Sequence, residues 1–256
     1  MTTAVAGCAS SLWKLYCEGY HDRDFLAGLF EHALGARSLK GDPSFKKGVF
    51  GYELGSQRVE IHASGGKKGA SDGFEAQLKQ AGAVRPAGLV ICLDEDDACD
   101  VDDARRRARE RILRMAERLP GFDPETLRLR TSADHEVALV PVTWCCADPS
   151  DPVLPQRQNL ERLMVAALCE AHPKRGPAVA TWLAARPRPP DDDASRSKSF
   201  SWSHMAGWFP SPGGNRFFGA VWSDDIEVRA ALIKRMAATG VDALLTAMGV
   251  TPPWSR

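Results

Sequence analysis

Residues 89–97 read Leu-Val-Ile-Cys-Leu-Asp-Glu-Asp-Asp, a short apolar run that ends in a block of acids. Such a run is typical of a strand buried on both faces of a parallel sheet. Open α/β sheets bind ligands at the carboxyl edge, where this strand would present Asp94 and Asp96. Oxygen ligands of this kind favour a hard cation such as Mg²⁺ or Mn²⁺. The alternative is a solvated loop whose aspartates cap the next helix.

The composition predicts one large α/β domain or a domain with an extension. The chain has 256 residues, of which 44% are apolar and 26% charged, enough to bury a sizeable core. Its formal net charge is zero, so nucleic-acid binding would depend on local basic faces. The seven cysteines include no C-x-x-C pair, which argues against a disulfide or zinc framework. This cysteine pattern favours a reducing cytosol, so we expect a cytoplasmic protein. No apolar run approaches the roughly 20 residues of a membrane span, so we do not expect the chain to enter membranes.

A first strand is predicted at residues 12–17, and it ends in Glu18-Gly19-Tyr20-His21-Asp22. A helix follows at once, because apolar residues recur at helical spacing from Phe25 until Gly35. Glu18 therefore lies at a strand end, and Asp22 lies about one turn further on. Taken alone, an acid at this position is more often a helix cap than a ligand.

Residues 36–66 predict a β-rich excursion with strands at 49–54 and 58–63. A flexible basic loop, Gly65-Gly66-Lys67-Lys68-Gly69, is expected before a helix near residues 72–81. Lys67 and Lys68 are candidates for contact with nucleic-acid phosphates. The loop lacks the G-x-x-x-x-G-K-[ST] pattern, so an ordinary glycine-rich turn with solvated lysines is the alternative.

A strongly charged helix is predicted over residues 102–119, after the acidic strand. Its apolar residues recur every three or four positions and define a core face. A basic stripe beside that face is a candidate for nucleic-acid binding, or an ordinary solvated face diluted by Glu110 and Glu117. The stripe consists of Arg107, Arg111, Arg114 and Arg118.

The character of the chain changes after a last predicted strand at residues 137–144. Residues 186–198 are proline-rich with three consecutive aspartates, and they predict an exposed linker. Helices are expected at 157–171, 176–185, 200–209 and 225–248, with Trp202, Trp208 and Trp222 as core anchors. The predicted division is an α/β core over 9–150 and a helical C-terminal extension over 155–256.

The two acidic motifs together resemble those of a TOPRIM domain, the metal-binding module of topoisomerases, primases, OLD-family nucleases and small stand-alone proteins. They are Glu18-Gly19-x-x-Asp22-x-x-Phe25-Leu26 and Asp94-x-Asp96, each after an apolar strand and before a helix. Small stand-alone TOPRIM groups also have an Asn/Gly-Leu-Glu helix start and a lysine before a Trp-bearing helix. Asn159-Leu160-Glu161 resembles the first of these features, and Lys198 ahead of Trp202 resembles the second.

The resemblance covers roughly residues 10–205. It implies a Rossmann-like TOPRIM core, with a mainly parallel sheet flanked by helices, plus a helical C-terminal extension. By resemblance to OLD-type sites, the cofactors are two Mg²⁺ or Mn²⁺ ions, held by two groups of carboxylates: Glu18, Asp22 and Glu161 for one ion, and Asp94 with Asp96 for the other. Lys198 would neutralise charge developing on the scissile phosphate, which places it with Glu18, Asp94 and Asp96 among the expected catalytic residues.

The expected activity is metal-dependent hydrolysis of phosphodiester bonds in DNA or RNA, with tRNA among the candidate substrates. Small TOPRIM proteins often serve as effectors in bacterial antiphage defence, sometimes held by an ATPase partner. Because the chain carries no Walker motif, nucleotide sensing would have to come from such a partner.

Two other functions stay open. One is a haloacid-dehalogenase-like phosphatase, in which Asp94-Glu95-Asp96 supplies nucleophile and acid and Asp224-Asp225 supplies metal ligands. The other is a non-catalytic interaction module, in which the acids bind Mg²⁺ to fix a loop and the C-terminal helices dock a partner.

Overall fold

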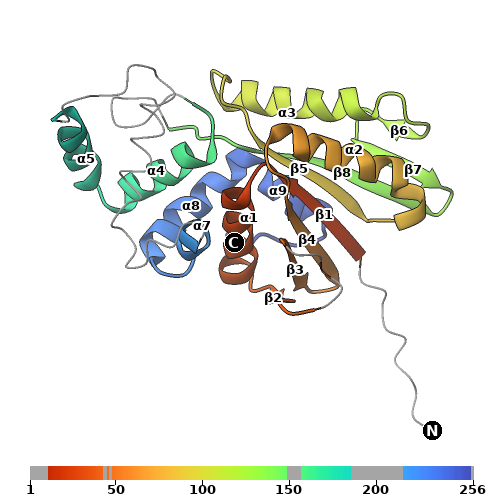
Figure 1. The fold of residues 1–256 in the computed structure, drawn as a ribbon, viewed down its shortest axis with the longest axis horizontal. Helices are drawn as coiled ribbons and strands as arrows, with labels where there is room; N and C mark the ends of the chain where they lie inside the picture. The colour runs from red at the N-terminus through yellow and green to blue at the C-terminus, as the bar shows by residue number, and fades with distance from the viewer. Residues whose placement is uncertain (1–10, 43–44, 46–47, 149–156, 186–215, 255–256) are drawn as a thin grey trace, which may run out of the picture.

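The structure is a computed structural model that describes residues 11–42, 45, 48–148, 157–185 and 216–254. These residues form one eight-stranded sheet with helices on both faces (Figure 1). The strands are β1 (Ser11–Cys17), β2 (Arg37–Ser38), β3 (Val49–Leu54), β4 (Gln57–Ala63), β5 (Gly88–Asp94), β6 (Phe122–Asp123), β7 (Arg128–Ser132) and β8 (His135–Trp144). The helices are α1 (Tyr20–Gly28), continued by the π-helical turn η1 (Leu29–Ala33), α2 (Lys67–Val84), α3 (Val101–Ala116), α4 (Leu160–Ala171), α5 (Arg175–Ala184), α7 (Arg216–Ala220), α8 (Ile226–Thr239) and α9 (Val241–Ala247).

The strand order is β2-β3-β4-β1-β5-β8-β7-β6. The four central strands, β4, β1, β5 and β8, run parallel. The outer strands pair antiparallel on both sides. This mixed sheet with a parallel centre confirms the predicted Rossmann-like α/β fold.

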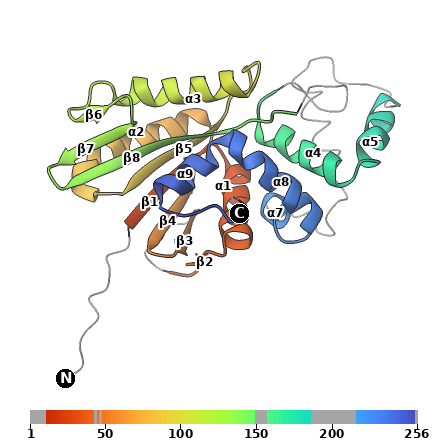
Figure 2. The same ribbon diagram turned by 180° about the vertical axis from the view of Figure 1, so that it is seen from behind.

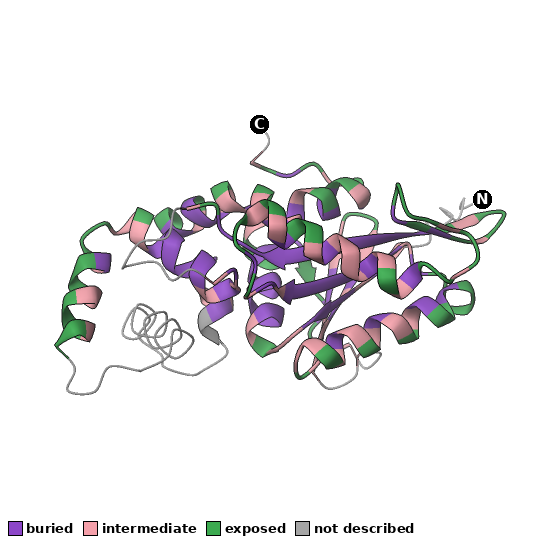
Figure 3. Cartoon of the chain, turned by 90° about the horizontal axis from the view of Figure 1, so that it is seen from above, coloured by how far each residue is buried: buried purple, intermediate pink, exposed green. Residues whose placement is uncertain are grey.

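Strand β5 lies at the centre of the sheet, and its side chains alternate between two hydrophobic layers. Leu89, Ile91 and Leu93 pack with α2 and α3 on one face. Val90 and Cys92 pack on the other face with α1, α4, α8 and α9. Figures 1 and 2 show the two helical layers from opposite sides, and Figure 3 shows the buried strands between them. The acidic stretch therefore follows a strand buried on both faces, as the apolar run predicted.

The C-terminal helices share a hydrophobic core with the α1 face of the sheet. Trp222 is fully buried there, as predicted, and it packs against Phe25 with ring centroids 5.0 Å apart. The close approach of α1 and α7 requires glycine, because a Cβ on Gly28 would lie 2.5 Å from Trp222 Cδ1 and 2.6 Å from the Gly219 carbonyl. These helices complete one face of the sheet. The division into a core and an extension at about residue 150 stays a prediction.

Several sequence-based boundaries are wrong. The helix predicted over 225–248 is two helices, because Gly240 adopts φ +87° between α8 and α9. Strands β6 and β7 were not predicted, since β7 reads Arg-Leu-Arg-Thr-Ser and buries Leu129 alone. The predicted linker at 186–198, the helix at 200–209, Trp202 and Trp208 lie outside the described residues. Among the helices that the structure describes, none has the length and apolar character needed to cross a membrane.

Candidate metal centre

The acids that follow β1 and β5 lie at the same edge of the sheet. These strands are parallel neighbours, with Cys17 opposite Cys92. Glu18 comes directly after Cys17, and Asp94 is the last residue of β5. Because parallel strands present their carboxyl ends at one edge, the fold brings the two predicted motifs together.

Asp94 joins this edge to helix α4. Its Oδ1 accepts a hydrogen bond of 2.9 Å from the Leu160 amide, and Glu161 follows in the first turn of α4. The pKa of Asp94 is raised well above its ordinary value, first because burial penalises its charge and then because four other carboxylates repel it. In decreasing order of effect, these are Asp22, Glu161, Asp96 and Glu18. The structure thus brings all five predicted metal ligands into one electrostatic cluster, here called the acidic cluster.

Glu18 has an oxygen that the described residues do not satisfy. Its Oε2 is buried without a hydrogen-bond partner among them. Burial raises the pKa of Glu18, and the charges of Asp96 and Glu161 raise it further, while Lys67 and Arg111 act in the opposite direction. A buried carboxylate oxygen without a donor is costly, and a bound cation would compensate for it.

Asp22 is a helix cap as well as a member of the acidic cluster. Its Oδ2 accepts a hydrogen bond of 2.8 Å from the Gly19 amide, and its Oδ1 accepts one of 2.6 Å from Nε1 of Trp144. The side chain is buried, and burial raises the pKa of Asp22 to about 7. Both oxygens are therefore occupied. The Gly19 bond caps α1, which is the role that the sequence left open, and the Trp144 bond ties α1 to β8.

The sequence predicted that Lys67 lies in a loop, but in the structure it is the first residue of α2. Its Nζ lies 2.7 Å from Oδ2 of Asp96. Oδ1 of the same carboxylate lies 3.4 Å from the side-chain Nδ2 of Asn159 and 3.8 Å from a guanidinium nitrogen of Arg157. Lys68 instead pairs with Asp72 at 2.5 Å, and its side chain is 88% exposed. Only the first of the two predicted lysines thus contacts a residue of the acidic cluster.

The predicted arginine stripe runs along α3, but acids neutralise much of its charge. Arg107 pairs with Asp103 at 3.0 Å, and Arg118 lies 3.9 Å from Glu117. Arg111 pairs with Glu95, a buried residue between Asp94 and Asp96. A cavity of about 330 Å³ lies along α3. It is lined by two glutamates and by three of the four stripe residues, Arg107, Arg111 and Arg114.

The acidic cluster fits a divalent cation by its donor chemistry. Its members offer only oxygen ligands, they repel one another, and one oxygen of Glu18 lacks a partner among the described residues. As the side chains stand, no three His, Cys, Asp or Glu residues in the described part of the chain converge closely enough to hold an ion. Binding would therefore require side-chain movement, above all at Asp96, which faces Lys67.

Two sequence-predicted features lie elsewhere. Lys198 is outside the described residues. Asp225 caps α8 through the Glu227 and Val228 amides and lies 2.8 Å from His172, just beyond the C-terminal end of α4. Asp94 contacts the other end of this 12-residue helix, a separation of about 18 Å at 1.5 Å per residue. Asp225 is therefore too far from Asp94 to serve as the metal ligand that the phosphatase hypothesis requires.

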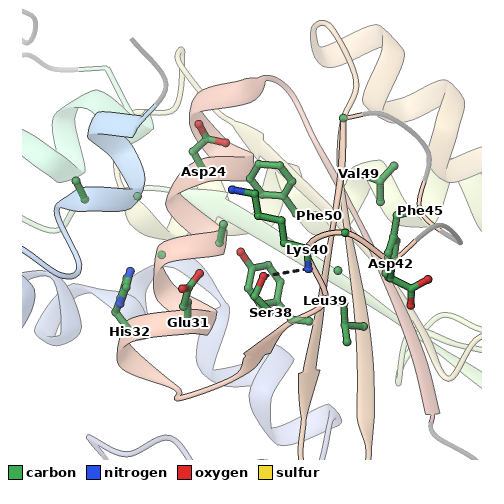
Figure 4. Close-up of a pocket in the computed structure, with 18 residues that line it drawn as sticks. Asp24, Glu31, His32, Ser38, Leu39, Lys40, Asp42, Phe45, Val49 and Phe50 are labelled. Atoms are coloured by element: carbon green, nitrogen blue, oxygen red, sulfur yellow. Dashed lines mark hydrogen bonds between the residues drawn. The ribbon is translucent and has the colours of Figure 1, made fainter. Parts of the chain in front are cut away.

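A separate cavity of about 570 Å³ lies between α1, β3 and α7. Figure 4 shows Asp24 of α1, Glu31 of η1 and Phe50 of β3 among the residues that line it. The described residues that line it include no member of the acidic cluster. Sequence patterns did not predict this cavity, because its walls come from segments far apart in the chain.

Comparison with models of known protein families finds no match, and comparison with curated proteins finds none either. Among solved structures, the chain is similar to the crystal structure of a hypothetical protein from Pyrococcus horikoshii, with a TM-score of 0.61. The two sequences are 16% identical, and the match covers 93% of this chain and 99% of the other. At this identity, the likeness supports the α/β fold alone.

Proposed function

We propose that the chain is a Mg²⁺- or Mn²⁺-dependent nuclease that hydrolyses phosphodiester bonds of DNA or RNA. The observation that supports this most strongly is the acidic cluster at the carboxyl edge of β1 and β5, where burial and then the charges of four other carboxylates raise the pKa of Asp94. Repelling acids at a sheet edge are costly unless a cation or a proton relieves them. The two motifs occur in the order found in TOPRIM domains, and this resemblance is the reason for proposing that the cation serves a nuclease.

In this proposal the carboxylates of Glu18, Asp94, Asp96 and Glu161 hold the metal. A bound divalent ion would polarise the phosphodiester and lower the pKa of a water molecule that acts as nucleophile. Asp22 keeps α1 and Trp144 in place through its two hydrogen bonds and acts on the site through its charge. Lys198 keeps its proposed role beside the scissile phosphate.

The substrate would approach along α3, because three arginines of the stripe on this helix line one cavity with Glu95, the residue between the two motif aspartates. Arg111 reaches Glu95 between the two motif aspartates, and Arg114 and Arg107 lie on the same cavity. The net charge of zero limits nonspecific attraction to nucleic acid. By resemblance, the proposal extends to a cytoplasmic antiphage effector that an ATPase partner brings to its substrate.

The test is incubation of the purified chain with plasmid DNA, single-stranded DNA and total tRNA, each with Mg²⁺, Mn²⁺ or EDTA. We expect cleavage of at least one polymer with metal, no cleavage with EDTA, and loss of cleavage in the Asp94→Ala/Asp96→Ala variant. Asp97→Ala is the matched control, because Asp97 is exposed and should be dispensable. Cleavage that persists in the double variant would refute the proposal.

A second candidate is a non-catalytic interaction module, and two contacts favour it. Asp94 accepts the Leu160 amide, and Asp96 pairs with Lys67, so both motif aspartates already have structural partners. In that case the double variant would lose stability, while neither the variant nor the parent chain would cleave any of the polymers.

A further inference from the structure

The backbone before Lys67 is fixed to the end of β1. Gly65 and Gly66 adopt φ values of +72° and +119°, which residues with side chains rarely adopt. The Gly66 amide donates a hydrogen bond of 2.7 Å to the Glu18 carbonyl, and the Ser64 amide donates one of 3.1 Å to the Cys17 carbonyl. These bonds set the start of α2, and with it Lys67, directly against the strand end that carries Glu18.

The side chain of Lys67 reaches into the acidic cluster from its rim. Its ammonium group lies 2.7 Å from Asp96 Oδ2, and the charges of Glu18 and Asp94 act on it as well. Because the side chain is 41% exposed, it has room to swing away from Asp96 into solvent. Lys67 thus places a positive charge, partly open to solvent, where the proposed metal would bind.

We propose that Lys67 is the resident counter-ion of the acidic cluster, which a divalent cation must displace from Asp96. This inference rests on the proposed function, because it assumes that the cluster is the metal site. The physical reason is like-charge repulsion, since an ammonium group and a divalent ion cannot share Asp96 at contact distance without mutual repulsion. Lys67 therefore weakens metal binding while it stabilises the metal-free cluster.

The test is titration of the full chain with Mn²⁺, followed by calorimetry, in the parent and three variants. We expect Lys67→Met to bind Mn²⁺ about fivefold more tightly, the size of a partly exposed ion pair. Lys67→Arg retains the charge and should bind as the parent does. Lys68→Met is the matched control, because Lys68 pairs with Asp72 outside the acidic cluster, and its affinity should not change. Circular dichroism would check that each variant is folded.

Unchanged or weaker Mn²⁺ binding by Lys67→Met would overturn the inference. So would equal tightening by Lys68→Met, or an absence of Mn²⁺ binding in every protein. The outcome is separable from that of the nuclease proposal. If Lys67→Met binds Mn²⁺ more tightly but the parent cleaves no polymer, the displacement of Lys67 by the cation is supported and the nuclease proposal is refuted. If the parent cleaves a polymer but Lys67→Met binds Mn²⁺ as the parent does, the nuclease proposal is supported and the displacement of Lys67 is refuted.

Discussion

The backbone amide of Leu160 donates a hydrogen bond of 2.9 Å to Oδ1 of Asp94. This bond joins the end of the central strand to the start of a helix 66 residues later in the chain, and it brings Glu161 beside the two motifs. We expect Asp94→Ala to be less stable than Asp94→Asn by about 1 kcal/mol, because the asparagine oxygen still accepts from Leu160. Urea denaturation in EDTA measures this difference, and equal stability of the two variants would contradict the role given to the bond.

The stability of the metal-free protein should fall as the pH rises. Burial raises the pKa of Asp22 from 3.8 to about 7, and the pKa values of Glu18 and Asp94 are raised as well. The folded state therefore binds more protons than the unfolded state between about pH 4 and pH 7, and stability is lost over that window. Carboxylates with a lowered pKa, such as Asp148 and Asp225, change the stability only below this pH window.

Denaturation in EDTA at pH 5 and pH 7.5 measures this effect, which we expect to be about 2 kcal/mol in favour of pH 5. Asp22→Asn keeps an oxygen for Trp144 but cannot titrate, so it should flatten the dependence. A parent protein that is more stable at pH 7.5 would contradict the electrostatic account of the acidic cluster.

The ion pair of Arg111 with Glu95 should be important for folding. Glu95 is buried, so Arg111→Met leaves a buried carboxylate without its partner. We expect a loss of about 2 kcal/mol, and a partial recovery in Arg111→Met/Glu95→Gln, which removes the uncompensated charge. Thermal denaturation of the single and double variants would reveal the recovery, and its absence would mean that packing rather than charge explains the loss.

The start of α2 depends on glycine at position 66. Because Gly66 has φ +119°, Gly66→Ala should destabilise the protein by about 1–2 kcal/mol. Gly82→Ala in the same helix is the control, since its added Cβ would meet Thr131 at an ordinary 3.9 Å. That change should instead stabilise by about 0.5–1 kcal/mol. Equal effects at the two positions would contradict the conformational argument.

The sequence predicted the parallel core well, because strands buried on both faces leave clear apolar runs such as residues 89–93. It also predicted that Glu18 and Asp94 would lie at the same edge of the sheet, since both follow such runs. The start of α2 was missed because Gly65-Gly66 is typical of a loop, whereas here it forms the approach to a helix. The contact of Lys67 with Asp96 could not be predicted, because it depends on how α2 lies across the ends of β1 and β5.

The most direct test of the central claim, that the acidic cluster binds a divalent cation, is a Mn²⁺ titration followed by electron paramagnetic resonance. We would compare the parent chain with Asp94→Asn and with Asp97→Asn, whose exposed carboxylate is three residues from Asp94. The account predicts saturable binding by the parent and by Asp97→Asn, and a loss of about tenfold or more in affinity for Asp94→Asn, because a negative ligand is removed. Binding by Asp94→Asn as tight as that of the parent would contradict it.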